Sequence, residues 1–230
     1  DIEQIYLPGW KPVDNFDLKE GQLLRQHQSV AIEVGHQIKN LLLVDAIGTG
    51  KTYTAIGSAL KNESLPAAFV VQTHLPNQFK EKIESFCHLN VHIIKSKKPY
   101  KLPKADIYIF KYSILAGWSD IFEQAFFKFV MFDEIQELRH GTTTAKGYAA
   151  NILAQSAEKV LGTTATPIYG YGIEMFNVME YIKKGSLGTR GQFNIEWCGG
   201  NDKIVKDPKS LGSYLRESQL MLRRTKKDIY

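Results

Sequence analysis

Short, mostly apolar runs recur along the chain, and successive runs begin 16 to 30 residues apart. Each run is three to five positions long and is continuous rather than alternating with polar residues. Continuous apolar runs are typical of strands that are covered on both faces, as in a parallel sheet. The runs predict strands at residues 41–44, 67–71, 91–94, 107–110, 129–132 and 159–161.

The stretches between these runs have the spacing of amphipathic helices. Helices are expected at residues 23–38, 51–61, 75–86, 112–125 and 144–155. A repeated strand–helix–strand order predicts an α/β domain whose central sheet is mostly parallel, with helices on both faces. Ligands of such folds bind at the carboxyl ends of the strands, so the residues that follow each apolar run are the candidates for chemistry.

The pattern changes after residue 182, where five glycines interrupt it and the last twenty residues are basic and helical in spacing. We therefore expect two parts. Residues 1–182 form the α/β lobe, which includes an N-terminal arm and helix, and residues 183–230 form a basic helical extension.

Composition narrows the class of protein without identifying it. The 230 residues are 43% hydrophobic and 23% charged, as in ordinary folded domains. The two cysteines, Cys87 and Cys198, form no C-x-x-C pair, which argues against a zinc ribbon and favours a reducing compartment. With no long apolar run and no signal-peptide pattern, we expect a cytoplasmic protein, or a nuclear one in a eukaryote.

Positive charge is concentrated in two stretches. The net charge is +5, five lysines lie between Lys95 and Lys104 without an acid, and Asp202 to the end holds eight Lys or Arg against four Asp or Glu. Such patches suit a polyanion such as DNA, although a solvated loop explains the lysine stretch equally well.

A glycine-rich loop with phosphate-binding chemistry follows the first run. Residues 45–52 read D-A-I-G-T-G-K-T, between a predicted strand and a predicted helix. In this context Gly48, Thr49 and Gly50 are expected to turn backbone N–H groups toward a nucleotide. Lys51 would reach the β- and γ-phosphates, and Thr52 would bind Mg²⁺. The general motif has a glycine where this loop begins with aspartate, so a simple strand–helix turn is the alternative.

Two adjacent carboxylates, Asp133 and Glu134, follow the apolar run at 129–132. Acids at the end of a buried strand are costly unless a cation or hydrogen bonds compensate them. We expect Asp133 to hold Mg²⁺ and Glu134 to activate a water molecule. By itself, such a pair is also a common helix start. Its occurrence after the phosphate loop in one alternating fold favours an ATPase.

Taken in order, these elements resemble the Swi/Snf-type DNA translocases of helicase superfamily two. The matching segments are L-R-Q-H-Q at 24–28, D-A-I-G-T-G-K-T at 45–52, D-E-I-Q at 133–136, T-A-T-P at 164–167 and L-R-R-T-K-K-D-I at 222–229. The last segment is the most discriminating, since other branches of the superfamily generally lack it. The chain departs from the family pattern at Ala46, Gln136 and Ala165.

The resemblance implies the first RecA-like P-loop lobe of a motor that uses ATP and Mg²⁺ and translocates on double-stranded DNA. A second RecA-like lobe would supply an arginine needed for hydrolysis, so this lobe alone should turn over little ATP. The family pattern assigns adenine contact to Gln28 and coupling of nucleotide state to lobe position to Gln136, Thr164 and Thr166. DNA contacts are implied for Thr73, His74, Lys111 and Tyr112.

Two other readings stay open from the sequence. A strand-separating helicase or the motor of a restriction system would share the same ATP chemistry. Alternatively, the substitutions at Ala46, Gln136 and Ala165 are compatible with a nucleic-acid-binding module whose ATPase is vestigial.

Overall fold

One seven-stranded sheet organises the part of the chain that the computed structural model describes, residues 2–7, 9–12, 16–166 and 172–229. The strand order is β3-β4-β2-β5-β6-β1-β7, and each neighbouring pair is parallel. The strands are β1 (Asn40–Leu43), β2 (Ala67–Val71), β3 (Val91–Ile93), β4 (Ile107–Lys111), β5 (Phe129–Asp133), β6 (Lys159–Thr163) and β7 (Met221–Leu222). The predicted α/β fold with a parallel sheet is therefore confirmed.

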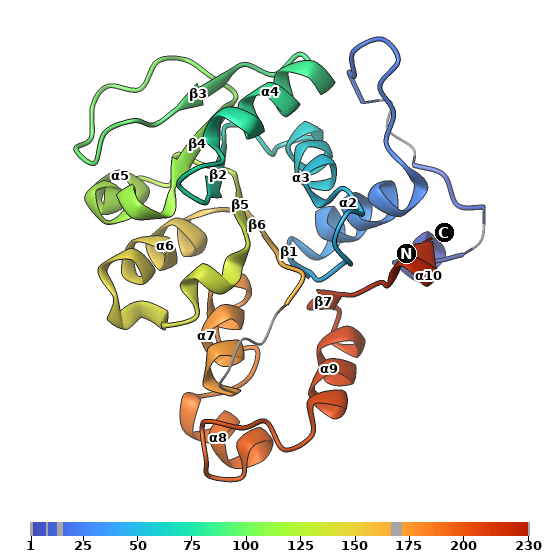
Figure 1. Cartoon of the computed structure of the whole chain (residues 1–230), viewed down its shortest axis with the longest axis vertical. Coiled ribbons are helices and arrows are strands. Elements are labelled where there is room, and N and C mark those ends of the chain that lie inside the picture. The colour runs from blue at the N-terminus through green and yellow to red at the C-terminus, as the bar shows by residue number, and fades with distance from the viewer. Residues whose placement is uncertain (1, 8, 13–15, 167–171, 230) are drawn as a thin grey trace.

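Helices cover both faces of this sheet (Figure 1). The α-helices are α1 (Ile2–Ile5), α2 (Gln26–Ile38), α3 (Lys51–Leu60), α4 (Pro76–Phe86), α5 (Ser119–Phe122), α6 (Ala145–Ser156), α7 (Gly172–Ile182), α8 (Arg190–Cys198), α9 (Pro208–Glu217) and α10 (Lys226–Ile229). Three short 3₁₀ segments are η1 (Tyr112–Trp118), η2 (Ile135–Leu138) and η3 (Gly141–Thr143). None of the described helices is both long and apolar enough to span a bilayer.

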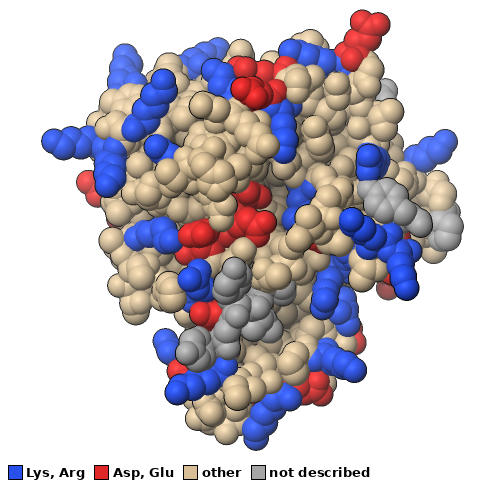
Figure 2. Space-filling model, in the orientation of Figure 1, with Lys and Arg blue, Asp and Glu red and all other residues tan. Residues whose placement is uncertain are grey.

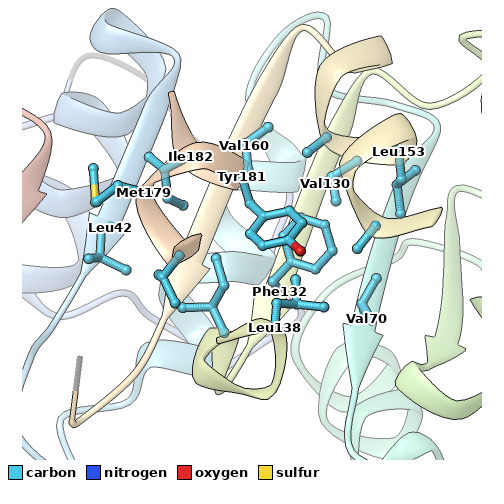
Figure 3. Close-up of a cluster of buried hydrophobic side chains, with 14 of the residues drawn as sticks. Leu42, Val70, Val130, Phe132, Leu138, Leu153, Val160, Met179, Tyr181 and Ile182 are labelled. Atoms are coloured by element: carbon cyan, nitrogen blue, oxygen red, sulfur yellow. The ribbon is translucent and has the colours of Figure 1, made fainter. Parts of the chain in front are cut away.

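The alternation of side chains along each strand divides the core into two layers. One layer holds Leu41 and Leu43 of β1 with side chains of α2, α3 and α4. The other holds Leu42 with side chains of α5, α6 and α7. Figure 3 shows this second layer, in which Tyr181 of α7 lies over Phe132 of β5, their ring centroids 6.4 Å apart. The two layers fix the sheet between them and hold its carboxyl edge in place.

The helix expected at residues 112–125 is replaced by η1 and the one-turn helix α5. Tight contacts with the preceding loop explain the difference. A Cβ on Gly117 would lie 1.8 Å from the carbonyl oxygen of Lys97, and the Trp118 indole donates a hydrogen bond of 2.9 Å to the Ser96 carbonyl. Backbone contact with the loop therefore overrides helical spacing here.

The last twenty residues are not continuously helical as their spacing suggested. α9 ends at Glu217, and the chain then forms β7 against β1 before the short helix α10. Figure 1 shows α8 and α9 projecting below the sheet and the chain returning to it at β7. The extension thus contributes an edge strand beside the first strand of the lobe.

The register of the sheet assembles the candidate residues at its carboxyl edge. Leu43 lies opposite Thr163 on one side and Leu222 on the other, and Thr163 in turn lies opposite Asp133. The loops that follow β1, β5, β6 and β7 consequently leave the sheet side by side.

Candidate nucleotide-binding site

The phosphate loop joins β1 to α3 and has the backbone that its glycines predict. Gly48 and Gly50 have φ angles of +84° and +85°, in the left-handed region that glycine adopts readily. Helix α3 begins at Lys51, directly after Gly50. Its first backbone N–H groups have no partner within the helix, so they form a cradle for an anion.

Lys51 lies across the start of this loop. Its ammonium donates hydrogen bonds to the carbonyl oxygens of Asp45, at 2.7 Å, and Ala46, at 3.3 Å. Partial burial lowers the pKa of Lys51, while the negative charges of Glu134, Asp45 and Asp133 oppose that shift. The lysine and the acidic pair, 82 positions apart in sequence, therefore interact electrostatically at one site.

The predicted adenine contact, Gln28, packs against the phosphate loop. Its amide nitrogen lies 3.2 Å from the Thr49 carbonyl oxygen and 3.3 Å from that of Gly50, and its amide oxygen accepts from the Arg25 backbone at 2.9 Å. Beside it opens a pocket of about 370 Å³. Tyr53 lines this pocket together with Gly21, Gln22, Leu23, Arg25, Gln28, Gly48, Thr49, Gly50 and Phe86.

The acidic pair ends β5. A carboxylate oxygen of Asp133 accepts a hydrogen bond of 3.0 Å from the Thr163 hydroxyl, and burial raises the pKa of Asp133 to about 6. Glu134 has a left-handed backbone, with φ 48° and ψ 59°. The amide nitrogen of Gln136 donates to Glu134 at 2.8 Å, whereas the buried Gln136 Oε1 atom has no hydrogen-bond partner among the residues that the structure describes. This arrangement orients one carboxylate and leaves the other in need of a cation.

The residues present fit a magnesium ion bound together with phosphates. The Thr52 hydroxyl on α3 and the Asp133 carboxylate would offer hard oxygen ligands, and the raised pKa of Asp133 reflects a buried charge that a cation would stabilise. Within the described ranges, no cluster of three or more His, Cys, Asp or Glu side chains forms a self-sufficient metal site. Mg²⁺ ordinarily takes one or two protein ligands and completes its shell with water and substrate phosphates.

The T-A-T-P segment begins directly after β6. The backbone N–H of Thr164 donates to the Leu43 carbonyl at 3.1 Å, which ties the segment to β1 beside the phosphate loop. The buried Thr164 hydroxyl accepts from the backbone of the exposed Thr166 at 3.0 Å. Pro167, the last position of the segment, lies outside the described residues.

The four predicted DNA contacts occupy different environments. Thr73 and His74 are exposed after β2, and Lys111 is half-buried at the end of β4. Tyr112 is buried, and its hydroxyl donates to the Asp133 carbonyl oxygen at 2.8 Å. Its side chain thus supports the acidic strand end from within the core, away from the surface.

The lysine stretch between β3 and β4 is exposed at each of its five lysines. Figure 2 shows acidic side chains gathered near the middle of one face of the molecule, with Lys and Arg spread around its margin. A polyanion would therefore meet favourable charge at the margin of this face and unfavourable charge at its centre.

The family profile of the SNF2-related domain matches residues 18–230. The chain belongs to the SNF2-related domain family. The predicted resemblance to Snf2-type ATPases of helicase superfamily two is thereby confirmed, and it extends over the phosphate loop, the acidic pair and the C-terminal extension.

Several curated proteins are similar to this SNF2-related domain. An uncharacterized ATP-dependent helicase of Mycoplasma genitalium is 23% identical over 199 residues, and another of Bacillus subtilis is 26% identical over 204. A SWI/SNF-related matrix-associated actin-dependent regulator of chromatin, subfamily A-like protein 1, of Drosophila melanogaster is 24% identical over 203. These alignments cover 82%, 84% and 82% of the chain but only 19%, 33% and 26% of the respective relatives.

A solved structure has the same fold. The SWI2/SNF2 ATPase core of Sulfolobus solfataricus, in complex with double-stranded DNA, superposes with a TM-score of 0.78 at 21% identity. The superposition covers 96% of this SNF2-related domain and 49% of the Sulfolobus chain. The domain therefore spans about half of a known ATPase core, and its RecA-like α/β fold is confirmed.

One contact of the site was absent from the sequence-based prediction. Arg224, just past β7, forms an ion pair with Asp45 at the start of the phosphate loop, with Nη2 and Oδ2 2.5 Å apart. The signal was the aspartate that replaces the usual first glycine of the loop. A buried carboxylate is costly without a compensating partner, but the sequence does not show that this partner is Arg224, 179 positions later.

Proposed function

We propose that this domain binds ATP with Mg²⁺ and forms the first lobe of a two-lobed, helicase-like motor that translocates along double-stranded DNA. The observation that carries the proposal is the meeting of the phosphate-loop lysine, Lys51, with the acidic pair at the carboxyl edge of one parallel sheet. The family supports the ATPase, and the names of the helicase relatives and the DNA-bound Sulfolobus core support the motor.

Hydrolysis would proceed by in-line attack of water on the γ-phosphorus. The loop N–H groups and Lys51 bind the β- and γ-phosphates and stabilise their charge. Glu134 accepts a proton from the water as its oxygen bonds to phosphorus and the bond to the β-phosphate oxygen breaks, releasing ADP and phosphate. Thr52 and Asp133 would hold Mg²⁺, which neutralises phosphate charge when bound.

The second lobe is proposed to complete the catalytic machinery. An arginine supplied from another domain raises turnover by about 10³–10⁵ in related phosphoryl-transfer systems, and this domain spans only part of its relatives. We therefore expect this domain alone to bind nucleotide and hydrolyse it slowly. In this proposal residues 1–182 are the ATP-binding lobe, and residues 183–230 form the extension toward the second lobe.

DNA would bind through the exposed loops at the carboxyl edge. The proposed contacts to the phosphate backbone of DNA are Thr73, His74 and Lys111. The exposed lysines between Lys95 and Lys104 would add positive charge beside them. Contacts of this kind recognise phosphate rather than base sequence, and their strength falls as salt rises. Tyr112 would act indirectly, because its hydroxyl supports the Asp133 carbonyl from inside the core.

The deciding experiment measures ATPase rates with and without duplex DNA, for this domain and for the longest natural protein that contains it. Lys51→Ala in the long protein is the control. Turnover that DNA stimulates and that the substitution abolishes would support the proposal. Strand separation in a forked-duplex assay would indicate a helicase instead, and DNA binding without ATP binding would indicate a binding module.

A further inference from the structure

The end of the described chain runs alongside the start of the phosphate loop. Backbone N–H groups of Leu42, Val44 and Ala46 donate in succession to the carbonyl oxygens of residues 220, 222 and 224, at 2.9, 2.8 and 3.0 Å. The first two bonds each involve a residue of β1 or β7, whereas the last joins Ala46, within the D-A-I-G-T-G-K-T loop, to Arg224 beyond both strands. The sheet pairing therefore continues into the loop itself.

The Arg224 side chain also contacts the start of the phosphate loop. Its Nε and Nη2 atoms donate to the two carboxylate oxygens of Asp45, at 3.1 and 2.5 Å, as a bidentate pair. Its remaining terminal nitrogen, Nη1, donates to the His27 carbonyl oxygen at 2.8 Å. One planar guanidinium thus joins the phosphate loop to the first turn of α2, a geometry that lysine cannot reproduce.

Asp45 and His27, which the Arg224 side chain contacts, each make a further hydrogen bond with the phosphate loop. The Asp45 carbonyl accepts from the Lys51 ammonium at 2.7 Å, and the His27 ring lies 2.8 Å from the Thr49 carbonyl oxygen through Nε2. A displacement of the guanidinium would therefore reach the loop at two separated points. One of these points is the lysine proposed to bind the β- and γ-phosphates.

Because the Asp45–Arg224 ion pair is largely buried, loss of one partner alone is costly. The side chains of Asp45 and Arg224 are 2% and 14% exposed. Removing the arginine would leave a carboxylate buried without its cation, which costs far more than loss of a surface ion pair. The loop would then have to rearrange to bring Asp45 to water or to another donor.

We propose that Arg224 is a positioning residue, which holds the phosphate loop in its nucleotide-binding shape and ties that shape to the segment that follows β7. The inference rests on the proposed function, because it assigns Arg224 a role in nucleotide binding. In the two-lobed motor this segment belongs to the connection between lobes. A movement of the second lobe would reach the phosphates through Arg224 and Asp45.

The test uses the longest natural protein and measures the Kd of a fluorescent ADP analogue, the KM and kcat for ATP, and the melting temperature. Arg224→Ala and Arg224→Lys are compared with Arg216→Ala, which removes an exposed arginine of α9. At a temperature where all variants are folded, we expect Arg224→Ala to weaken nucleotide binding and raise KM at least tenfold. The Kd and KM of Arg224→Lys should lie between those of the wild type and Arg224→Ala, and those of Arg216→Ala should match the wild type.

A purely structural role gives a different result. A folded Arg224→Ala protein with wild-type Kd and KM, and only a lower melting temperature, would overturn the proposal. If Arg224→Ala fails to fold, the Kd of Arg224→Lys for the ADP analogue decides instead. Asp45→Asn should weaken nucleotide binding to a similar extent. Combining it with Arg224→Lys should weaken binding little further, because both substitutions disrupt the same ion pair. Failure of the wild type to bind nucleotide would instead refute the proposed function.

Discussion

The side-chain amide of Gln136 donates a hydrogen bond of 2.8 Å to the carboxylate of Glu134. Glu134 itself has a left-handed backbone conformation, which is uncommon for a residue with a side chain and is often found at functional sites. Backbone and amide together fix the direction of this carboxylate. Gln136 therefore orients Glu134 by hydrogen bonding, although its neutral amide cannot itself titrate near neutral pH.

Gln136→Ala should lower kcat for ATP about tenfold and leave the Kd for ADP close to the wild-type value, since a positioned base contributes to the chemical step. Steady-state ATPase assays with DNA and fluorescent-ADP binding would measure the two effects. Gln155→Ala, which alters an exposed glutamine of α6, is the matched control. An unchanged kcat would show that Glu134 is oriented without the amide.

Alanine at Gly50 should destabilise the nucleotide-free protein more than alanine at Gly48. Both glycines have a positive φ, but a Cβ on Gly50 would lie 2.4 Å from the Gln28 amide nitrogen, whereas one on Gly48 would meet no atom of the described part of the chain within 4 Å. Backbone strain alone costs about 1–2 kcal/mol. Thermal or urea unfolding would measure the difference, and Gln28→Ala should recover part of the loss in Gly50→Ala. Equal destabilisation by the two alanines would contradict this account.

Asp133→Asn should stabilise the metal-free protein at pH 7.5. Burial raises the Asp133 pKa from its ordinary 3.8 to about 6, so the folded state binds this proton more tightly than the unfolded state does. The ionised carboxylate then costs folding up to about 3 kcal/mol above pH 6. The penalty develops as pH rises from 3.8 to about 6, so the advantage of the variant should shrink toward pH 4.

Melting temperatures of the two proteins across this pH range would test the sign. Asparagine keeps an oxygen that can accept from the Thr163 hydroxyl, so the substitution removes charge with little change in shape. A lower melting temperature for Asp133→Asn at pH 7.5 would refute the expectation. The same variant should lose ATP turnover if Asp133 holds the metal.

Lys111→Gln should weaken duplex binding equally for different DNA sequences and reduce the magnitude of the salt slope of log Kd by about one. The substitution removes one proposed phosphate contact at the carboxyl edge. Lys39→Gln, at the opposite edge before β1, is the control. Binding titrations by fluorescence anisotropy at several salt concentrations would measure both slopes. A slope that both variants share with the wild type would argue against DNA contact at Lys111.

Hydrophobic patterning predicted most of the sheet because its inner strands are buried on both faces. β2 is the clearest example, since the run at 67–71 is buried at every position. The phosphate loop and acidic pair were also predictable, because each needs particular residue types directly after a strand. Parallel pairing then brought Asp133 and Thr163 into register without any signal beyond strand order.

Other features depended on contacts between distant segments. β7 is two residues long, too short for any periodicity to show, and its partner lies 179 positions earlier, at Leu42. Tyr112 matched a family position for DNA contact, yet its hydroxyl reaches inward to the Asp133 carbonyl. Such placements follow from which side chains fill the space beside a strand, and sequence spacing carries no information on that.

The pairing of β7 with β1 also has a consequence for how the chain assembles. Until residues 220–224 are present, β1 is an edge strand, and its unpaired backbone groups can recruit strands of other chains. Contacts that join residues so far apart in sequence form late, because closing the long intervening segment costs entropy. A protein shortened to end before Met221 should therefore aggregate on expression, even though it would retain every residue of the phosphate loop and the acidic pair.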